Sequence, residues 1–467
     1  MEGNAKVAIF WDESFLWGLI AYDTFRQLGV SFDLLSSGDI RDGALEGRAV
    51  LFVPGGWASD KIVALGDTGR DAIRDYVAGG GSYLGFCGGA GLALSHESGL
   101  GLAAFGRVPT IERLPSFSGR IVLERTESNH PMWAGVGDGA AFHAWWPGQF
   151  AIEDGSGAEV LARYAQPLAD SYVTDLPVGP AYDWKKWEEA YGINLDPERI
   201  IGEPAVVETR FGDGRVVLSY LHFETPGDMD GNRVLANLLD YLAGSQRSDG
   251  SGSSLAASVP GEPAAATAGD GIARVAGGEA GARAPAGQEA SAGAGTSILL
   301  PPDLVGPGPR TGAHSIALEL AAAMDAFIEL GRRNFLWYRR EPWLLQWRRG
   351  MRGIEYSTLA AMLGQIARLV PEDDGQEDAL LEDLQELRAR VLPFLEGARR
   401  LIILERFAMT AGPISPLKTD DDGIAELRGR LFSTSKRCGG EYEQITSQAD
   451  SILLPLLRKE LAPPSTS

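Results

Sequence analysis

The chain has 467 residues, 44% of them hydrophobic, which is enough for two or more domains with packed cores. It contains only two cysteines, so a disulfide framework is excluded and a reducing, cytoplasmic location is expected. The formal net charge is −21, and most of the acidic excess lies before residue 244, which argues against nucleic acid as a ligand.

Residues 1–243 alternate short apolar runs with amphipathic segments. This alternation predicts an α/β domain with a doubly wound, mostly parallel, flavodoxin-like sheet. The sequence predicts strands over 6–11, 31–35, 49–53 and 82–86, a hairpin over 205–220, and helices over 14–28, 68–77 and 231–242.

Residues 244–312 consist mainly of Ala, Gly, Ser and Pro, which predicts a disordered linker because such a segment buries too little apolar surface. Within it, 297–302 forms a small apolar island that could dock on a neighbouring part of the protein. From 313 to 467, apolar residues recur at helical spacing, which predicts an all-α bundle of four or five helices. Pro393 and Pro455 are expected to kink or end helices.

The N-terminus lacks a basic region followed by an apolar one, so no signal peptide is expected. No apolar stretch is long enough for a membrane span.

The segment Gly85-Phe86-Cys87-Gly88-Gly89 follows the apolar run of the fourth predicted strand. A cysteine between glycines at a strand-to-helix turn is typical of a strained elbow that presents a nucleophile. Cys87 is therefore the candidate catalytic thiol. The alternative is a small buried side chain with no chemical role, as most free cysteines are.

A thiol nucleophile needs a base, and His222 is the best placed of the five histidines because it follows a predicted strand. Glu224 lies two residues further on, so the two side chains can share a face and the carboxylate can orient the imidazole. The alternative is a hydrogen-bonded histidine at a strand edge and a solvated acid.

Backbone N–H groups that could stabilise an oxyanion are expected in two places. Gly55 and Gly56 follow the third predicted strand in Pro54-Gly55-Gly56, and Gly88 follows the thiol. These glycines are the candidate substrate-binding groups.

Together, Pro54-Gly55-Gly56, the Cys87 elbow and His222-Phe223-Glu224 resemble, in order and spacing, the class I glutamine amidotransferase-like superfamily. Within it, residues 5–243 look most like the N-terminal domain of eukaryotic-type biotin–protein ligases, with cues in 52–56, 73–87 and 129–135. The resemblance implies an amidotransferase-type fold in which Cys87 is the nucleophile, His222 the base, and Glu224 its orienting acid.

Residues 92–96 lack the glutamine-binding signature of true amidotransferases, and no Gly-Arg-Gly-Arg-type adenylate loop of a ligase core occurs. The function expected from the resemblance is a cysteine hydrolase that cleaves a C–N bond of a small amide or peptide-like substrate. Neither a cofactor nor a metal ion is expected.

Two aromatic-rich stretches leave further alternatives open. The rings between His143 and Trp187 could line a small-molecule pocket or pack in the core, and 183–189 could form a lid. In 332–352, arginines alternate with aromatic residues, which is typical of an amphipathic helix with a solvated arginine face. The same stretch could instead bind a partner protein, nucleic acid or an anionic membrane. The alternative to a hydrolase is a catalytically inactive, amidotransferase-like binding or regulatory module whose helical domain recruits a partner.

Overall fold

The computed structural model describes residues 6–96, 99–244, 312–372, 378–412, 414–415, 419–433 and 439–462. The predicted linker, its apolar island at 297–302 and Cys438 lie outside the described residues, apart from the linker's two end residues. None of the described helices is long and apolar enough to cross a membrane.

The α/β part is built on one large sheet whose strand order is β11-β10-β6-β9-β12-β13-β4-β3-β1-β2, with β7 paired to β6. Its parallel half contains β1 (Val7–Phe10), β2 (Phe32–Leu35), β3 (Val50–Val53), β4 (Ser82–Phe86) and β13 (Gly214–Ser219). Every residue of β1, β3 and β4 is buried, as continuous apolar strands require when helices cover both faces.

The rest of the sheet is antiparallel. The predicted hairpin is formed by β12 (Pro204–Phe211) and β13, and the sheet continues from β12 through β9 (Glu159–Pro167) to β6 (Phe117–Arg125). The edge and short strands are β5 (Gly106–Arg107), β7 (Ala141–Trp145), β8 (Phe150–Ala151), β10 (Tyr172–Val173) and β11 (Leu176–Pro177).

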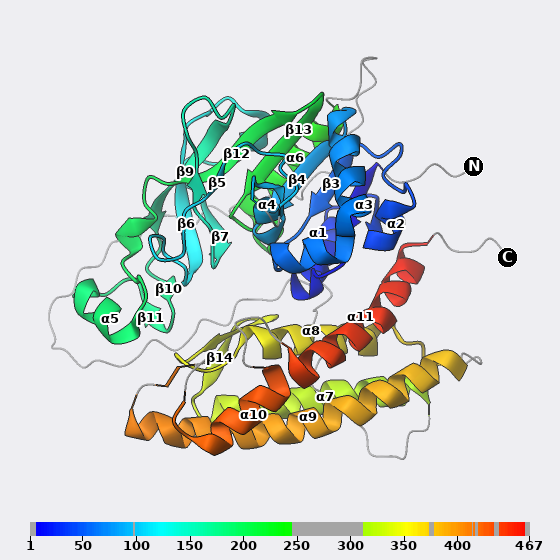
Figure 1. The fold of residues 1–467 in the computed structure, drawn as a ribbon, viewed down its shortest axis with the longest axis vertical. Helices are drawn as coiled ribbons and strands as arrows, with labels where there is room; N and C mark the ends of the chain where they lie inside the picture. Colours follow the sequence, from blue (N-terminus) through cyan, green and yellow to red (C-terminus); the bar gives the residue numbers. More distant parts are fainter. Residues whose placement is uncertain are drawn as a thin grey trace, which may run out of the picture.

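The helices of this part are α1 (Phe15–Gln27), α2 (Ser37–Arg41), α3 (Ala58–Ala78), α4 (Gly88–Ala93), α5 (Trp184–Tyr191) and α6 (Met229–Gly244). Most of them lie against the sheet, whereas α5 lies away from its faces, next to β11 (Figure 1). The α3 helix starts ten residues earlier than the sequence predicts, and its backbone kinks at Gly66, where φ is 62°. The predicted α/β fold of this part is therefore confirmed.

The C-terminal part is helical and forms a separate layer on one side of the α/β part (Figure 1). Its helices are α7 (Ala313–Arg333), α8 (Ile354–Leu369), α9 (Asp378–Ala411), α10 (Asp422–Phe432) and α11 (Gly440–Leu461). Pro393 lies inside α9 and Pro455 inside α11, so neither proline ends its helix.

The predicted amphipathic helix within 332–352 is wrong over most of that stretch. Residues Trp337–Glu341 and Leu344–Trp347 form a β-hairpin, β14–β15. Aromatic residues favour strands. Trp343 and Trp347 pack against Trp145 and Trp146 of the α/β part, whereas Trp337 packs against Phe327 and Tyr356 of the helical part.

Polar contacts join the two parts at both ends of their interface. Near α1, Trp11 Nε1 donates to Asp450 Oδ1 at 2.8 Å, and the Tyr22 hydroxyl donates to Glu460 Oε2 at 2.6 Å. At the hairpin, Gln346 Nε2 donates to the Thr174 carbonyl at 2.9 Å. The hairpin is therefore attached directly to the sheet.

Candidate functional site

Cys87 lies at the turn between β4 and α4, as the sequence predicts. Its backbone has φ 50° and ψ −107°, which is strained for a residue that is not glycine. The Cys87 N–H donates to the Ser219 carbonyl at 2.8 Å, which attaches the elbow to the end of the neighbouring strand β13. Cys87 is only partly buried.

The glycines around the elbow allow an unusually close approach between it and the loop after β3. A methyl group added at Gly88 would lie 1.8 Å from the Gly56 carbonyl oxygen. Gly56 has φ 112°, a conformation that favours glycine. These contacts explain why Gly rather than Ala follows the cysteine, and they place Gly55 and Gly56 beside the elbow.

The backbone N–H groups of Gly55, Gly56 and Gly88 take part in no hydrogen bond with any described residue. Free N–H groups beside a thiol are the donors that an oxyanion in acyl transfer requires. All three predicted glycines therefore lie together around the elbow.

His222 and Glu224 follow β13, the strand next to β4. The His222 Nδ1–H donates to Glu224 Oε1 at 2.7 Å, and both side chains are fully buried. Because β13 and β4 are parallel neighbours, their carboxyl ends meet at one edge of the sheet, and this brings His222 to the Cys87 side.

The loop that carries these two side chains is held by several hydrogen bonds. The Thr24 hydroxyl donates to the Glu224 carbonyl at 2.7 Å, and Asn232 Nδ2 donates to the Phe223 and Thr225 carbonyls at 2.9 Å each. The His222 N–H donates to the His143 carbonyl at 2.8 Å. The imidazole is thus oriented by its backbone as well as by Glu224.

Charge determines the protonation of His222. Burial alone lowers the pKa of the imidazole, but the charges of Glu224 and Cys87 outweigh burial and raise this pKa to about 10. Cys87 acts on His222 through its charge and through a side-chain contact. This contact is not a hydrogen bond of ordinary geometry, because His222 Nε2 has no hydrogen-bond partner within the described part of the chain. The arrangement favours an imidazolium beside the sulfur.

An aromatic cluster covers the imidazole. The Trp17 ring lies 4.4 Å from the His222 ring, and it also contacts Trp146 and Trp343 at centroid distances of 6.4 and 6.1 Å. Trp343 belongs to the C-terminal hairpin and contacts Trp145 at 5.5 Å. The first part of the predicted aromatic wall therefore lies at the site, joined by a ring from the helical part.

The second part of that wall lies elsewhere. Tyr182, Trp184, Trp187 and Tyr191 contact one another around α5, and Arg349 from the C-terminal part donates to the Tyr191 carbonyl at 2.8 Å. The lid suggested for 183–189 remains a prediction.

A buried lysine lies next to the Pro54–Gly56 loop. Lys61 is fully buried, and its ammonium group donates to the Asp12 carbonyl at 3.1 Å and to the Ser14 hydroxyl. Burial lowers the pKa of Lys61 to about 7, although the charges of Glu13 and Asp12 oppose this shift. Lys61 fixes the 12–14 turn, which in turn contacts Gly56 through the Glu13 carbonyl.

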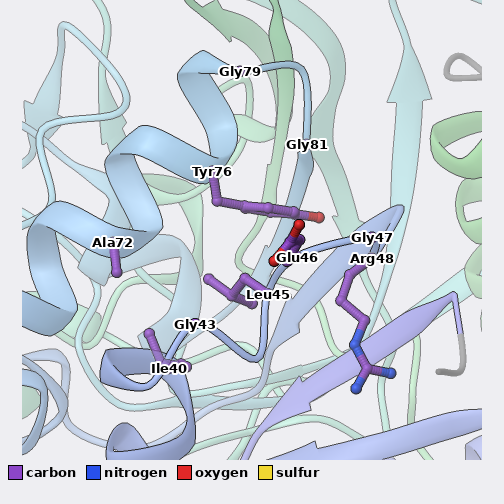
Figure 2. A pocket seen from close by; sticks show the side chains of 10 residues that line it. All are labelled: Ile40, Gly43, Leu45, Glu46, Gly47, Arg48, Ala72, Tyr76, Gly79 and Gly81. Atoms are coloured by element: carbon purple, nitrogen blue, oxygen red, sulfur yellow. The ribbon is translucent and has the colours of Figure 1, made fainter.

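Of two cavities, one lies at the candidate site and the other lies away from it. One of about 380 Å³ lies between the two parts and is lined by Gly56 and Trp17 together with residues of α8 and α11. Figure 2 shows another, of about 390 Å³, between α2 and α3 and lined by Tyr76, Gly79 and Gly81. This second cavity lies at the start of β4, at the opposite end of that strand from Cys87, and is remote from the site.

No group of three or more His, Cys, Asp or Glu side chains among the described residues is arranged to hold a metal ion. The fold and the site define an α/β protein with a cysteine at a strand-to-helix elbow and a buried His–Glu pair on the neighbouring strand.

Residues 43–96 match the family model "Biotin-protein ligase, N terminal", so the predicted resemblance is confirmed over this stretch. A search of curated proteins gave no match.

The chain is also similar to solved structures, among them the following three. This chain is similar to a glutamine amidotransferase at 22% identity, with 51% of this chain and 99% of that chain covered and a TM-score of 0.31. It is similar to a glutamine amidotransferase from Thermotoga maritima at 14% identity, with coverage of 52% and 99% and a TM-score of 0.32. It is also similar to a β-galactosidase from Bacillus circulans at 17% identity, with coverage of 51% and 31% and a TM-score of 0.31.

Sequence reasoning missed Trp17, Lys61 and Trp343. Trp17 lies on a helix whose pattern marks only a packing face, Lys61 precedes the helix predicted over 68–77, and Trp343 lies in a segment predicted as a helix. For Lys61 the sequence offered one signal, a lysine among acidic and apolar neighbours, and that pattern does not show that the side chain is buried.

Proposed function

We propose that this protein is a cysteine-dependent hydrolase that cleaves the C–N bond of a small amide or peptide-like substrate. The observation that carries the proposal is the buried His222–Glu224 hydrogen bond beside a partly exposed, backbone-strained Cys87. A nucleophile, a base and a group that orients the base are the three elements that acyl transfer needs.

In this mechanism the Cys87 thiolate attacks the carbonyl carbon of the amide. The N–H groups of Gly55, Gly56 and Gly88 stabilise the resulting oxyanion. The imidazolium of His222 protonates the leaving nitrogen, the C–N bond breaks, and a thioester to Cys87 remains. His222 then removes a proton from water, which attacks the thioester and releases the acid and the thiolate.

Glu224 acts on the imidazole rather than on the substrate. Its carboxylate fixes the tautomer of His222 and stabilises the charged ring. One of the three proposed oxyanion donors, Gly56, lines the cavity between the two parts, which also supports the proposal.

The test uses the Cys438→Ala variant, so that Cys87 is the only thiol. We expect iodoacetamide to alkylate Cys87 readily at pH 7, and His222→Ala to slow alkylation by about 100-fold, within the usual range for loss of a general base. His130→Ala is the matched control, because His130 also bonds a glutamate, Glu208, at 3.2 Å, in a different place. Equal rates for wild type and His222→Ala would overturn the proposal.

A second measurement looks for the covalent intermediate. The protein is mixed with a panel of small amides, and intact mass is recorded over time. An acyl adduct that requires Cys87 and disappears with time is expected for at least one amide. An unreactive thiol at 87 would instead favour the inactive binding module.

A further inference from the structure

Two arginines near the elbow have no carboxylate partner. Arg107 ends β5 and lies opposite Phe150 of β8, and Arg113 follows six residues later. Neither forms an ion pair with any described residue, although the protein carries 63 acidic residues against 42 Lys and Arg. In a protein this acidic, leaving two neighbouring cations unpaired requires an explanation.

Both arginines lie near Tyr220, which leaves β13 two residues before His222. The Tyr220 ring lies 4.3 Å from the ring of Phe150, the residue paired with Arg107, and it packs against Gly148. Tyr220 is only 2% exposed. The pairing of β5 with β8 therefore brings Arg107 near the tyrosine, whose pKa burial raises and the charges of Arg107 and Arg113 lower.

Several donors in this group are buried without an acceptor. Within the described part of the chain, the Tyr220 hydroxyl and the Nε and Nη1 atoms of Arg113 make no hydrogen bond of ordinary geometry. A buried donor without an acceptor is unfavourable because it has lost its hydrogen bonds to water, and three such atoms lie together here. Such a cost is typical of a binding site rather than of a structural contact.

The group lies close to the candidate nucleophile. Tyr220 directly follows Ser219, whose carbonyl accepts the Cys87 N–H at 2.8 Å. Burial lowers the pKa of Arg113, and the neighbouring charge of Arg107 lowers it further. The two guanidinium groups therefore repel each other near the elbow. An anion placed between them would relieve the repulsion of the two cations and accept the free donors.

We propose that Arg107, Arg113 and Tyr220 form an anion subsite beside Cys87, which binds a carboxylate or phosphate group on the substrate. This inference rests on the proposed function and specifies its substrate class: an amide that carries a negatively charged oxyacid group close to the scissile bond. Paired guanidinium groups and a phenol hydroxyl are the donors that such a group requires.

The test compares an anionic and a neutral reagent of similar size at Cys87. Iodoacetate and iodoacetamide are reacted with the Cys438→Ala protein at fixed ionic strength, and the ratio of their rate constants is measured. A change in the reactivity of the thiol itself alters both rate constants, so the ratio alone reports the loss of anion binding in Arg107→Gln, Arg113→Gln and Tyr220→Phe. Each arginine variant should lower the iodoacetate-to-iodoacetamide ratio about fivefold.

Controls separate local binding from net charge and from misfolding. Arg120→Gln removes the same charge from an exposed ion pair with Asp170 and should leave the ratio unchanged. Arg107 is exposed, so Arg107→Gln keeps the test decisive if Arg113→Gln fails to fold. Protection of Cys87 by succinate, by inorganic phosphate, or by both identifies the type of anion.

The outcomes for the two proposals are distinct. If iodoacetamide reacts in a His222-dependent way but the reagent ratio is the same in all variants, the subsite is wrong and the hydrolase proposal stands. A ratio that falls equally in Arg120→Gln, or the absence of protection by either anion, also overturns the subsite. A thiol that is inert to iodoacetamide overturns the hydrolase proposal itself.

Discussion

The indole of Trp17 lies against the imidazole of His222, with ring centroids 4.4 Å apart and planes inclined by 30°. This contact, together with the Glu224 hydrogen bond, restricts the imidazole at two positions: its face and its Nδ1 edge. Trp17 in turn contacts Trp343 of the hairpin, so the packing of the C-terminal part extends to the candidate base.

Trp17→Leu should slow alkylation of Cys87 by iodoacetamide roughly tenfold, because a loosened imidazole spends less time in the reactive geometry. The measurement is the second-order rate constant in the Cys438→Ala background. Trp57→Leu is the control, since Trp57 is 61% exposed and its loss should have little effect. Equal rates in both variants would show that the stacking contact does not position the base.

Gly88→Ala should destabilise the fold by about 1–3 kcal/mol, the usual cost of overpacking, because the new methyl group would collide with the Gly56 carbonyl. It should also suppress Cys87 alkylation by displacing the Gly55–Gly56 loop. Urea unfolding and the alkylation rate measure the two effects.

Gly91→Ala in the same helix is the matched control. Its methyl group would find its nearest neighbour, the Ala58 Cβ, at 3.7 Å, which is ordinary contact. This variant should gain up to about 1 kcal/mol from helix propensity. A Gly88→Ala protein as stable as Gly91→Ala would contradict the close approach of the two loops.

Lys61 predicts a pH dependence of stability. Burial lowers its folded-state pKa to about 7 from an ordinary value of 10.5. Between these values the unfolded chain binds the lysine proton and the folded protein does not, so this group makes the protein more stable as pH rises from 7 to 10. The free energy of unfolding of wild type minus that of Lys61→Met should therefore increase over this range.

Urea unfolding at several pH values measures this difference. Lys185→Met provides the comparison, since Lys185 is exposed and its removal should give a difference that does not vary with pH. If the difference in the free energy of unfolding between wild type and Lys61→Met does not change with pH, the lysine reaches solvent or keeps its proton in the folded protein.

Trp343→Ala should cost about 3 kcal/mol or more of stability, because the ring is 4% exposed and packs between Trp17 and Trp145. Hydrogen exchange in β7 should become faster, since Trp145 belongs to that strand. Tyr338→Ala on the same hairpin is the control, because Tyr338 is 45% exposed. Unchanged exchange in β7 would indicate that the hairpin does not stabilise the sheet.

Local pattern determined much of the α/β part. Alternating apolar runs and amphipathic segments predicted β1, β2, β3 and β4 and the hairpin of β12 with β13, because strand and helix periodicities are properties of neighbouring residues. The same local logic singled out Cys87 and its glycines. For the segment of β14–β15, periodicity failed, since its tryptophans pack against a different part of the chain.

The sequence by itself thus determined the order of the strands along the chain, the elbow at Cys87 and the pairing of His222 with Glu224 two residues away. Only the tertiary structure decided what surrounds them. Trp17 and Trp343 are far from His222 in the chain, and the three rings meet because β13 lies beside β4 and the hairpin packs on the sheet edge. Contacts of this kind depend on which elements become neighbours, and the pattern within a single segment carries no information about its partners.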